Sequence, residues 1–349
     1  GIIQKLTNIS ANQILEIVEP QQTKVSGIVY FDTNNDGVKQ DSEPTVSRAA
    51  IKVVPTNAKV YSSDAGTFSF YTTQNDVELR ILEENGLSAG SKVFDLTNYQ
   101  PSQKIFIAAA STCNDTDLKI NMGGTAIRKG YTNNQFKIVV SNQSRNISNS
   151  SILKFTVPSS VNIISPSLPI AQQESFVENS KNYTRYSWSM GSLNPFNNKV
   201  ISFMTGTDAS VSVGDELDFK GEIVNSSADC NIDDNLLMQK YPVYGAIDPN
   251  DILVSPKGYG TEGYILPDQL LTYTIRFENV GNFATQNVSI IDNIPQELDI
   301  NTFKIVSASH DNVSVEIIDN KITFKLENVF LPPTSEDSDR AQGYVTFSI

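Results

Sequence analysis

The sequence predicts an all-β protein made of β-sandwiches that follow one another along the chain. Short segments in which apolar and polar residues alternate recur throughout, for example at 136–140, 153–157 and 273–277. Alternation with a period of two is typical of strands that bury one face. Asn, Gly, Ser and Pro bound these segments and are the usual turn formers, whereas convincing helical periodicity is absent. Pairs of sheets packed face to face are therefore the expected architecture.

The length of 349 residues suits two or three domains of about 100–150 residues each. The net charge of -13 argues against a nucleic-acid partner, which needs a clustered basic face to displace counterions from phosphates. No apolar run approaches the roughly 18 residues that span a bilayer, so no membrane-spanning segment is expected. The chain begins with Gly1 and without a signal segment, which indicates a fragment or a processed chain.

The N-terminal third is expected to contain one sandwich. Residues 1–20 fit neither the strand period nor the helical period of apolar residues. They are expected to be the tail of a preceding domain or a linker. Residues 21–112 begin with a β-branched and aromatic strand at 24–31. Their second half has a turn at 63–66 that feeds a strand with two phenylalanines on one face.

The segment from Asp32 to Glu43 fits the twelve-residue calcium-loop pattern D-x-[DN]-x-[DN]-G-x5-E at every specified position. Gly37 permits the sharp turn at its middle because it has no Cβ. The expected ligands are the side chains of Asp32, Asn34, Asp36 and Glu43, the carbonyl of Val38, and Gln40 directly or through water, with Asp41 as a spare acid. A hairpin turn that binds nothing would use similar residues, but it gives no reason for Glu at the twelfth position. Because a strand precedes the loop, we expect Ca²⁺ in an extracellular β module.

The later two thirds of the chain are expected to be two copies of one module, at 113–247 and 248–349. Phe136-x-Ile138-x-Val140-x-Asn142 matches Tyr273-x-Ile275-x-Phe277-x-Asn279, and the register holds to 200–203 and 344–347. The first copy continues through further strands at 211–224, so the second copy is expected to be C-terminally incomplete. Either chain beyond Ile349 or a strand from another chain would complete it.

Two cysteines, Cys113 and Cys230, lie near the ends of the first copy. They could form one disulfide if the first and last strands of that sandwich lie side by side, or they could be separate thiols.

The stretch from Gly27 to Gly37, together with Glu43, resembles the B-type calcium-binding repeat of the serine-aspartate repeat surface proteins. The resemblance covers roughly residues 24–75 and implies ligands at Asp32, Asn34, Asp36 and Glu43. The Gly that usually follows the Glu is replaced here by Pro44-Thr45.

Residues 248–349 are similar to the conserved-repeat, Ig-like module that precedes the sorting signal of Bacteroidetes surface proteins exported by type nine secretion. The resemblance begins with Asp248-Pro-Asn-Asp251 and continues through 271–279. It implies export across the outer membrane, with display on the outer-membrane exterior or release. For the whole chain we expect tandem Ig-like or prealbumin-like sandwiches in an elongated array. The residues themselves favour turn caps at Asp248, Asn250 and Asp251, with a second cation site as the alternative.

The leading interpretation is a non-catalytic stalk or scaffold segment of a large secreted or cell-surface adhesin, stabilised by calcium. Its expected partners are other domains of the same chain and an unidentified surface, glycan or protein ligand. The alternative is a carbohydrate-binding accessory module of a secreted polysaccharide-degrading protein, for which Tyr183, Tyr186 and Trp188 supply aromatic rings. Trp188 is expected instead to anchor the core between sheets.

No catalytic residues are expected. His310 is the single histidine, and Ser309-His310-Asp311 is expected in a turn that faces water. One loop histidine with its sequence neighbours does not supply the geometry of a nucleophile and its base. A pair of carboxylates brought together by the fold, as in a glycosidase, is the remaining catalytic option.

Overall fold

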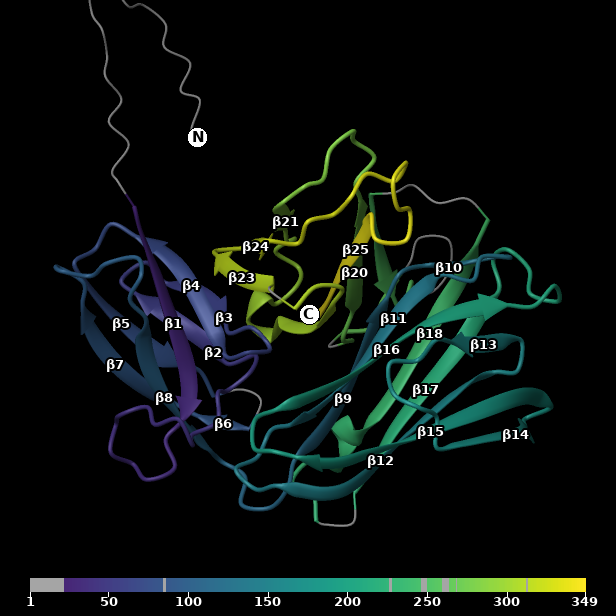
Figure 1. Cartoon of the computed structure of the whole chain (residues 1–349), viewed down its shortest axis with the longest axis horizontal. Helices are drawn as coiled ribbons and strands as arrows, with labels where there is room; N and C mark the ends of the chain where they lie inside the picture. Colours follow the sequence, from purple (N-terminus) through teal and green to yellow (C-terminus); the bar gives the residue numbers. More distant parts are fainter. Residues whose placement is uncertain are drawn as a thin grey trace, which may run out of the picture.

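A computed structural model describes residues 22–83, 86–225, 228–245, 250–258, 264–267, 269–311 and 313–349. In this part of the chain the regular elements are 25 strands and two short 3-10 helices, which confirms the all-β fold (Figure 1). The expected tail at 1–20 and the turn residue Asp248 lie outside the described residues. No helix among the described residues has the length and apolar character needed to cross a bilayer.

The first sandwich contains eight strands in two layers. One sheet has the order β4-β1-β8-β6, and the facing strands follow the order β3-β2-β5-β7. The bounds are β1 (Thr23–Phe31), β2 (Ala50–Val54), β3 (Ala58–Tyr61), β4 (Thr67–Thr72), β5 (Asp76–Ile81), β6 (Leu87–Ser88), β7 (Gly90–Asp95) and β8 (Ile105–Ser111). Alternate residues of β1 and β4, such as Val25, Val29, Phe68 and Phe70, are buried between the layers. The predicted face with two phenylalanines is therefore a core face.

The second sandwich is larger. Its sheets have the orders β13-β16-β11-β9 and β10-β18-β17-β12-β15-β14. The bounds are β9 (Leu118–Gly124), β10 (Ile127–Arg128), β11 (Asn134–Asn142), β12 (Ser148–Pro158), β13 (Val161–Ile164), β14 (Gln172–Glu178), β15 (Lys181–Leu193), β16 (Asn198–Thr207), β17 (Glu216–Val224), η1 (Ile232–Asn235) and β18 (Leu236–Tyr244). The rings of Phe136, Phe155, Phe203 and Phe219 pack against one another between the sheets. Trp188 is fully buried in the same core, as predicted.

The third sandwich pairs the order β19-β20-β25-β22 with strands β21-β24-β23. The bounds are β19 (Asp251–Ser255), β20 (Thr272–Glu278), β21 (Val288–Asn293), η2 (Ile300–Thr302), β22 (Lys304–Ala308), β23 (Val313–Ile318), β24 (Lys321–Leu326) and β25 (Gln342–Ser348). Tyr273 pairs with Phe347 as Phe136 pairs with Phe203 in the second sandwich. One difference is that β12 pairs with both β15 and β17, whereas β21 pairs with β24 alone among the described strands.

The expected elongated array is wrong, because the three sandwiches lie against one another (Figure 1). Strand β23 pairs with β3, with Glu316 opposite Val60, so the first and third sandwiches share a seven-stranded sheet. The hydroxyl of Tyr344 in the third sandwich donates to the carbonyl of Gly123 in the second at 3.1 Å. The sandwiches contact one another through strand pairing at a sheet edge and through buried aromatic side chains. The period-two pattern of a single strand does not reveal which other strand pairs with its edge.

Candidate metal centres

The predicted calcium loop leaves the first sandwich at the end of β1 and returns to the same strand. The carbonyl of Pro44 accepts a hydrogen bond from the Phe31 amide at 2.9 Å, and Thr45 forms a bridge with Tyr30. The Pro44-Thr45 pair, which replaces the usual Gly, therefore closes the loop against β1.

Backbone amides fix the acidic side chains of the loop. Gly37, at φ +74°, donates to Asp32 Oδ2 at 2.8 Å, and Val38 donates to Asp36 Oδ1 at 2.8 Å. The bond from Val38 is the main reason that the pKa of Asp36 is lowered. The sharp turn predicted at Gly37 thus places two carboxylates over the same stretch of backbone.

Glu43 is 3% exposed. Its Oε1 accepts from the Thr33 amide at 2.8 Å and its Oε2 accepts from the Gln40 amide at 3.0 Å. Among the described residues no lysine or arginine forms an ion pair with it. A buried carboxylate without a counter-charge is unfavourable, so this position suits a bound cation.

The other predicted ligands are more exposed. The amide groups of Asn34 and Gln40 donate to Asp36 Oδ2 at 3.0 and 2.7 Å, so they turn nitrogen and not oxygen towards this carboxylate. Val38 is 62% exposed, and Asp41 is also exposed. Among the described residues, Asp32, Asp36 and Glu43 do not bring three carboxylate oxygens within 4.8 Å of one another. The side chains supply the oxygen ligands that a hard cation takes, but binding would require the carboxylates to converge and both amides to present oxygen to the ion.

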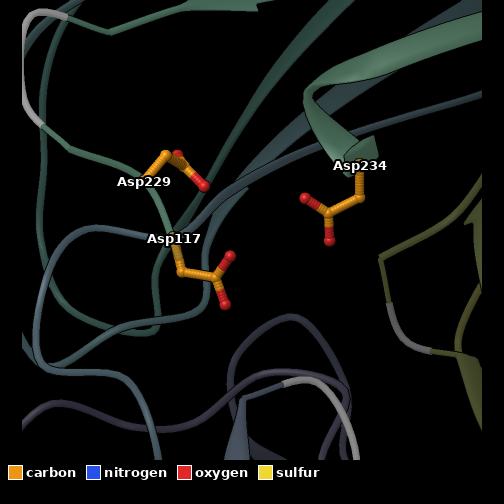
Figure 2. Close-up of side chains that lie close together, drawn as sticks. All are labelled: Asp117, Asp229 and Asp234. Carbon is orange, nitrogen blue, oxygen red and sulfur yellow. The ribbon is translucent and has the colours of Figure 1, made fainter. Parts of the chain in front are cut away.

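A second acidic cluster, absent from the sequence predictions, lies at one end of the second sandwich. Asp117, Asp229 and Asp234 each offer a carboxylate oxygen, and these oxygens lie within 4.8 Å of one another (Figure 2). Asp117 precedes β9, Asp229 follows β17, and Asp234 lies in η1. Among the described residues this is the one group of three acidic side chains that approaches so closely.

Covalent and backbone bonds hold this cluster together. Cys113 and Cys230 form a disulfide, which settles the alternative left open by the sequence. The Cys230 amide donates to the Thr116 carbonyl at 2.8 Å, and Thr116 forms a bridge with Asp229. The end of the second sandwich is therefore tied to its beginning, directly beside Asp117.

Burial raises the pKa of Asp117 to about 6, with a further contribution from the charge of Asp229. Burial likewise raises the pKa of Asp234 to about 7. Both oxygens of Asp229 accept from backbone amides, those of Leu118 and Asn231, at 3.0 Å. The cluster thus concentrates acidic groups where water solvates them poorly.

The aromatic residues of the carbohydrate-binding alternative do not form a surface platform. Tyr183, Tyr186 and Trp188 are 5%, 4% and 0% exposed. The indole Nε1 of Trp188 donates to the Leu168 carbonyl at 3.1 Å inside the core. These three rings therefore offer no sugar-stacking face.

His310 lies in the expected turn between β22 and β23, but it faces water only in part. His310 is half-buried and lines a small cavity between the first and third sandwiches. The ion pair of Lys137, in the second sandwich, with Asp311 at 3.2 Å lies beside it. The Nδ1 of His310 lies 2.8 Å from Ser309 Oγ, which also accepts from the Tyr344 amide at 2.9 Å. Ser309 thus bonds to the backbone of Tyr344 within the third sandwich.

The alternative of a cation at Asp248–Asp251 does not fit the described residues. Asp251 forms a two-point ion pair with Arg276, and Asn250 Oδ1 accepts from the Glu278 amide at 3.3 Å. The oxygens of Asp251 are therefore already neutralised by a guanidinium group.

Residues 248–349, which are 102 of the 349 residues, match a family described as "Domain of unknown function (DUF7619)". No curated protein matches the chain.

Among solved structures, bacterial surface pilins and adhesins are structural neighbours. The major pilin subunit BcpA of Bacillus cereus has a TM-score of 0.24 and 11% identity over 88% of this chain and 85% of the pilin. The N-terminal domain of the Streptococcus gordonii adhesin Sgo0707 has a TM-score of 0.21 and 12% identity over 84% of this chain and 58% of the adhesin. These similarities are weak and do not assign a function to this chain.

Proposed function

We propose that this chain is a non-catalytic structural segment of a secreted or cell-surface protein of the adhesin type. Calcium bound by the loop at Asp32–Glu43 stabilises its first sandwich and the contact of that sandwich with the second. The segment acts as a block of three mutually packed sandwiches that carries other domains of the same protein.

The observation that carries this proposal is the position of the loop at an interface. Asp32, the first proposed ligand, directly follows Phe31, whose ring packs against Phe196 of the second sandwich. An ion that orders the loop therefore also orders the strand end that makes this contact.

The disulfide between Cys113 and Cys230 supports an extracellular setting, because such bonds persist in oxidising compartments. The resemblances of residues 24–75 and 248–349 support the finer proposal of type nine export and display on the outer-membrane exterior. In this proposal, other domains of the same protein contact the external surface, glycan or protein ligand.

Extracellular calcium at millimolar concentration is sufficient for a weak site. A ligand that binds only the folded state adds RT ln(1 + [L]/Kd) to the free energy of unfolding, which is about 1.4 kcal/mol at ten times Kd. Extracellular modules have Kd values of about 10⁻⁴–10⁻³ M. We therefore expect a modest but measurable effect of calcium on stability.

The test compares thermal unfolding and proteolysis of the full chain in calcium and in EGTA. Calcium is expected to raise the melting temperature by a few degrees and to protect residues 32–43 from cleavage. The double variant Asp32→Asn/Asp36→Asn should lose the protection of the loop. The double variant Asp76→Asn/Glu83→Gln removes two exposed acidic charges elsewhere in the first sandwich and should keep it. Equal cleavage of the wild-type loop in calcium and in EGTA would contradict the proposal.

A further inference from the structure

The Asp117 cluster has the dimensions of a cation site. Its three carboxylate oxygens lie within 4.8 Å of one another, which is about twice the 2.3–2.6 Å distance between calcium and an oxygen ligand. One ion can therefore contact all three. The side chains come from three separate segments and point towards a common space (Figure 2).

Buried oxygens without donors are a second and independent observation. Asp117 is 5% exposed, and its Oδ1 has no hydrogen-bond partner among the described residues. Asp234 Oδ1 and the neighbouring Asn235 Oδ1 are also buried without partners. More than nine in ten buried polar groups in proteins are paired, so unpaired acceptors beside one another indicate a positively charged ligand.

Besides Lys304, whose charge favours ionisation of Asp234, Lys119 is the alternative source of positive charge. Its charge favours ionisation of both Asp117 and Asp234. However, it forms no ion pair within 4.0 Å of either carboxylate in the described part of the chain. Burial, followed by the charge of Lys304, also lowers the pKa of Lys119. Amines that form no ion pair with Asp117, Asp229 or Asp234 among the described residues do not neutralise these three carboxylates.

We propose that Asp117, Asp229 and Asp234 form a second divalent-cation site, which takes calcium and lies beside the disulfide. Carboxylate oxygens are the ligands that calcium prefers, and water or backbone carbonyls complete its six to eight contacts. Asp229, oriented by two amides, and Asp117, fixed by the start of β9, provide the rigid part of the site. Asp234 adds a ligand from η1.

The Asp117 cluster lies beside Gly86 of the first sandwich. A Cβ added at Gly86, which precedes β6, would lie 3.2 Å from Asp117 Oδ2. The Gly86 carbonyl also accepts from the Thr112 amide at 2.9 Å, directly before Cys113. The ion would therefore stabilise the closure of the second sandwich and its contact with the first.

The test is calorimetric titration of CaCl₂ into the full chain that carries Asp32→Asn/Asp36→Asn, which disables the loop at Asp32–Glu43. This chain is expected to bind one calcium ion and to melt at a higher temperature in calcium than in EGTA. Adding Asp117→Asn should abolish both effects. Asp115→Asn is the matched control, because Asp115 is exposed and its loss changes the charge equally; it should keep both effects.

A second variant guards against misfolding. Asp234→Asn changes a partly exposed residue in η1 and should weaken binding while circular dichroism stays unchanged. In EGTA, Asp117→Asn is expected to melt no lower than its parent, because it removes a buried charge. If the loop-disabled chain binds no calcium, or if Asp117→Asn binds as well as Asp115→Asn, the inference is overturned. If the wild type binds a single calcium ion and Asp32→Asn/Asp36→Asn abolishes that binding, the site at Asp117 is overturned and the loop proposal stands.

Discussion

The ring of Phe196 in the second sandwich packs against Phe31 of the first, with 4.9 Å between the ring centroids. Phe196 is 4% exposed and belongs to the apolar core of the first sandwich, although it lies between β15 and β16 of the second. Nearby, Ser47 Oγ donates to the Phe196 carbonyl at 3.3 Å. One aromatic side chain thus joins the two sandwiches at the base of the loop at Asp32–Glu43.

Phe196→Ala is expected to destabilise the first sandwich and to separate its unfolding from that of the second. Removal of a buried phenylalanine side chain costs about 3–5 kcal/mol, from lost burial and from the cavity that remains. Differential scanning calorimetry should show a lower and split transition. Phe283→Ala removes the same group from a residue that is 85% exposed and should leave the transition unchanged. A single, unshifted transition in Phe196→Ala would contradict the proposed coupling.

The disulfide is expected to contribute several kcal/mol to stability. Cys113 and Cys230 are separated by 117 residues, and closing a loop of about 100 residues restricts the unfolded chain by roughly 4–5 kcal/mol in the chain-entropy model. Cys113→Ser/Cys230→Ser should therefore lower the free energy of unfolding by about 2–5 kcal/mol, measured by guanidinium denaturation. Addition of a reductant should reproduce the loss in the wild type and have no effect on the double variant. A loss below 1 kcal/mol in both experiments would show that backbone pairing alone holds this end of the sandwich.

His310 gives the stability a defined pH dependence. Burial lowers its pKa, as does the charge of Lys137, while Asp311 opposes them; Arg48 and Asp64 line the same cavity. The folded chain therefore disfavours the imidazolium. The contribution of His310 is complete above the unfolded pKa of about 6.5 and is lost as the pH falls through the folded pKa.

The measurement is urea denaturation of the wild type and of His310→Gln between about pH 5 and pH 8. The stability of the wild type relative to His310→Gln should fall as the pH falls. Buried carboxylates with raised pKa values, such as Asp117, have the opposite slope, but they are present in both chains and cancel in the difference. A difference that rises on acidification would contradict the buried position of His310.

The strands could be predicted from the sequence because alternation is a local property. The core positions of Phe136 and Trp188 and the sharp turn at Gly37 follow from neighbouring residues. The Asp117 cluster could not be predicted in this way, because Asp117 and Asp229 are 112 positions apart and meet through one bridge and one disulfide. The available signal in the sequence was that each of the two cysteines has an aspartate close to it, so a disulfide would bring two acidic residues together. The pairing of β3 with β23 is similarly long-range, so the packing of the sandwiches against one another was missed.

Tyr30 lies beside the loop at Asp32–Glu43 and is a buried tyrosine of the first sandwich. It is fully buried, and its hydroxyl has no hydrogen-bond partner among the described residues. Burial raises its pKa, and the charges of Asp32, Glu43 and Asp36 raise it further. A buried hydroxyl without a partner costs about 1–3 kcal/mol in proteins.

Tyr30→Phe is therefore expected to keep or increase the free energy of unfolding. Tyr61→Phe in the same sandwich should instead lower it by about 1 kcal/mol, because the Tyr61 hydroxyl donates to the Phe303 carbonyl at 2.9 Å. Both variants are measured by urea denaturation in calcium and in EGTA. If Tyr30→Phe lost as much stability as Tyr61→Phe in calcium but not in EGTA, the Tyr30 hydroxyl would have a hydrogen-bond partner in the ion-bound loop. An equal loss in both buffers would show that the hydroxyl is already paired without the ion.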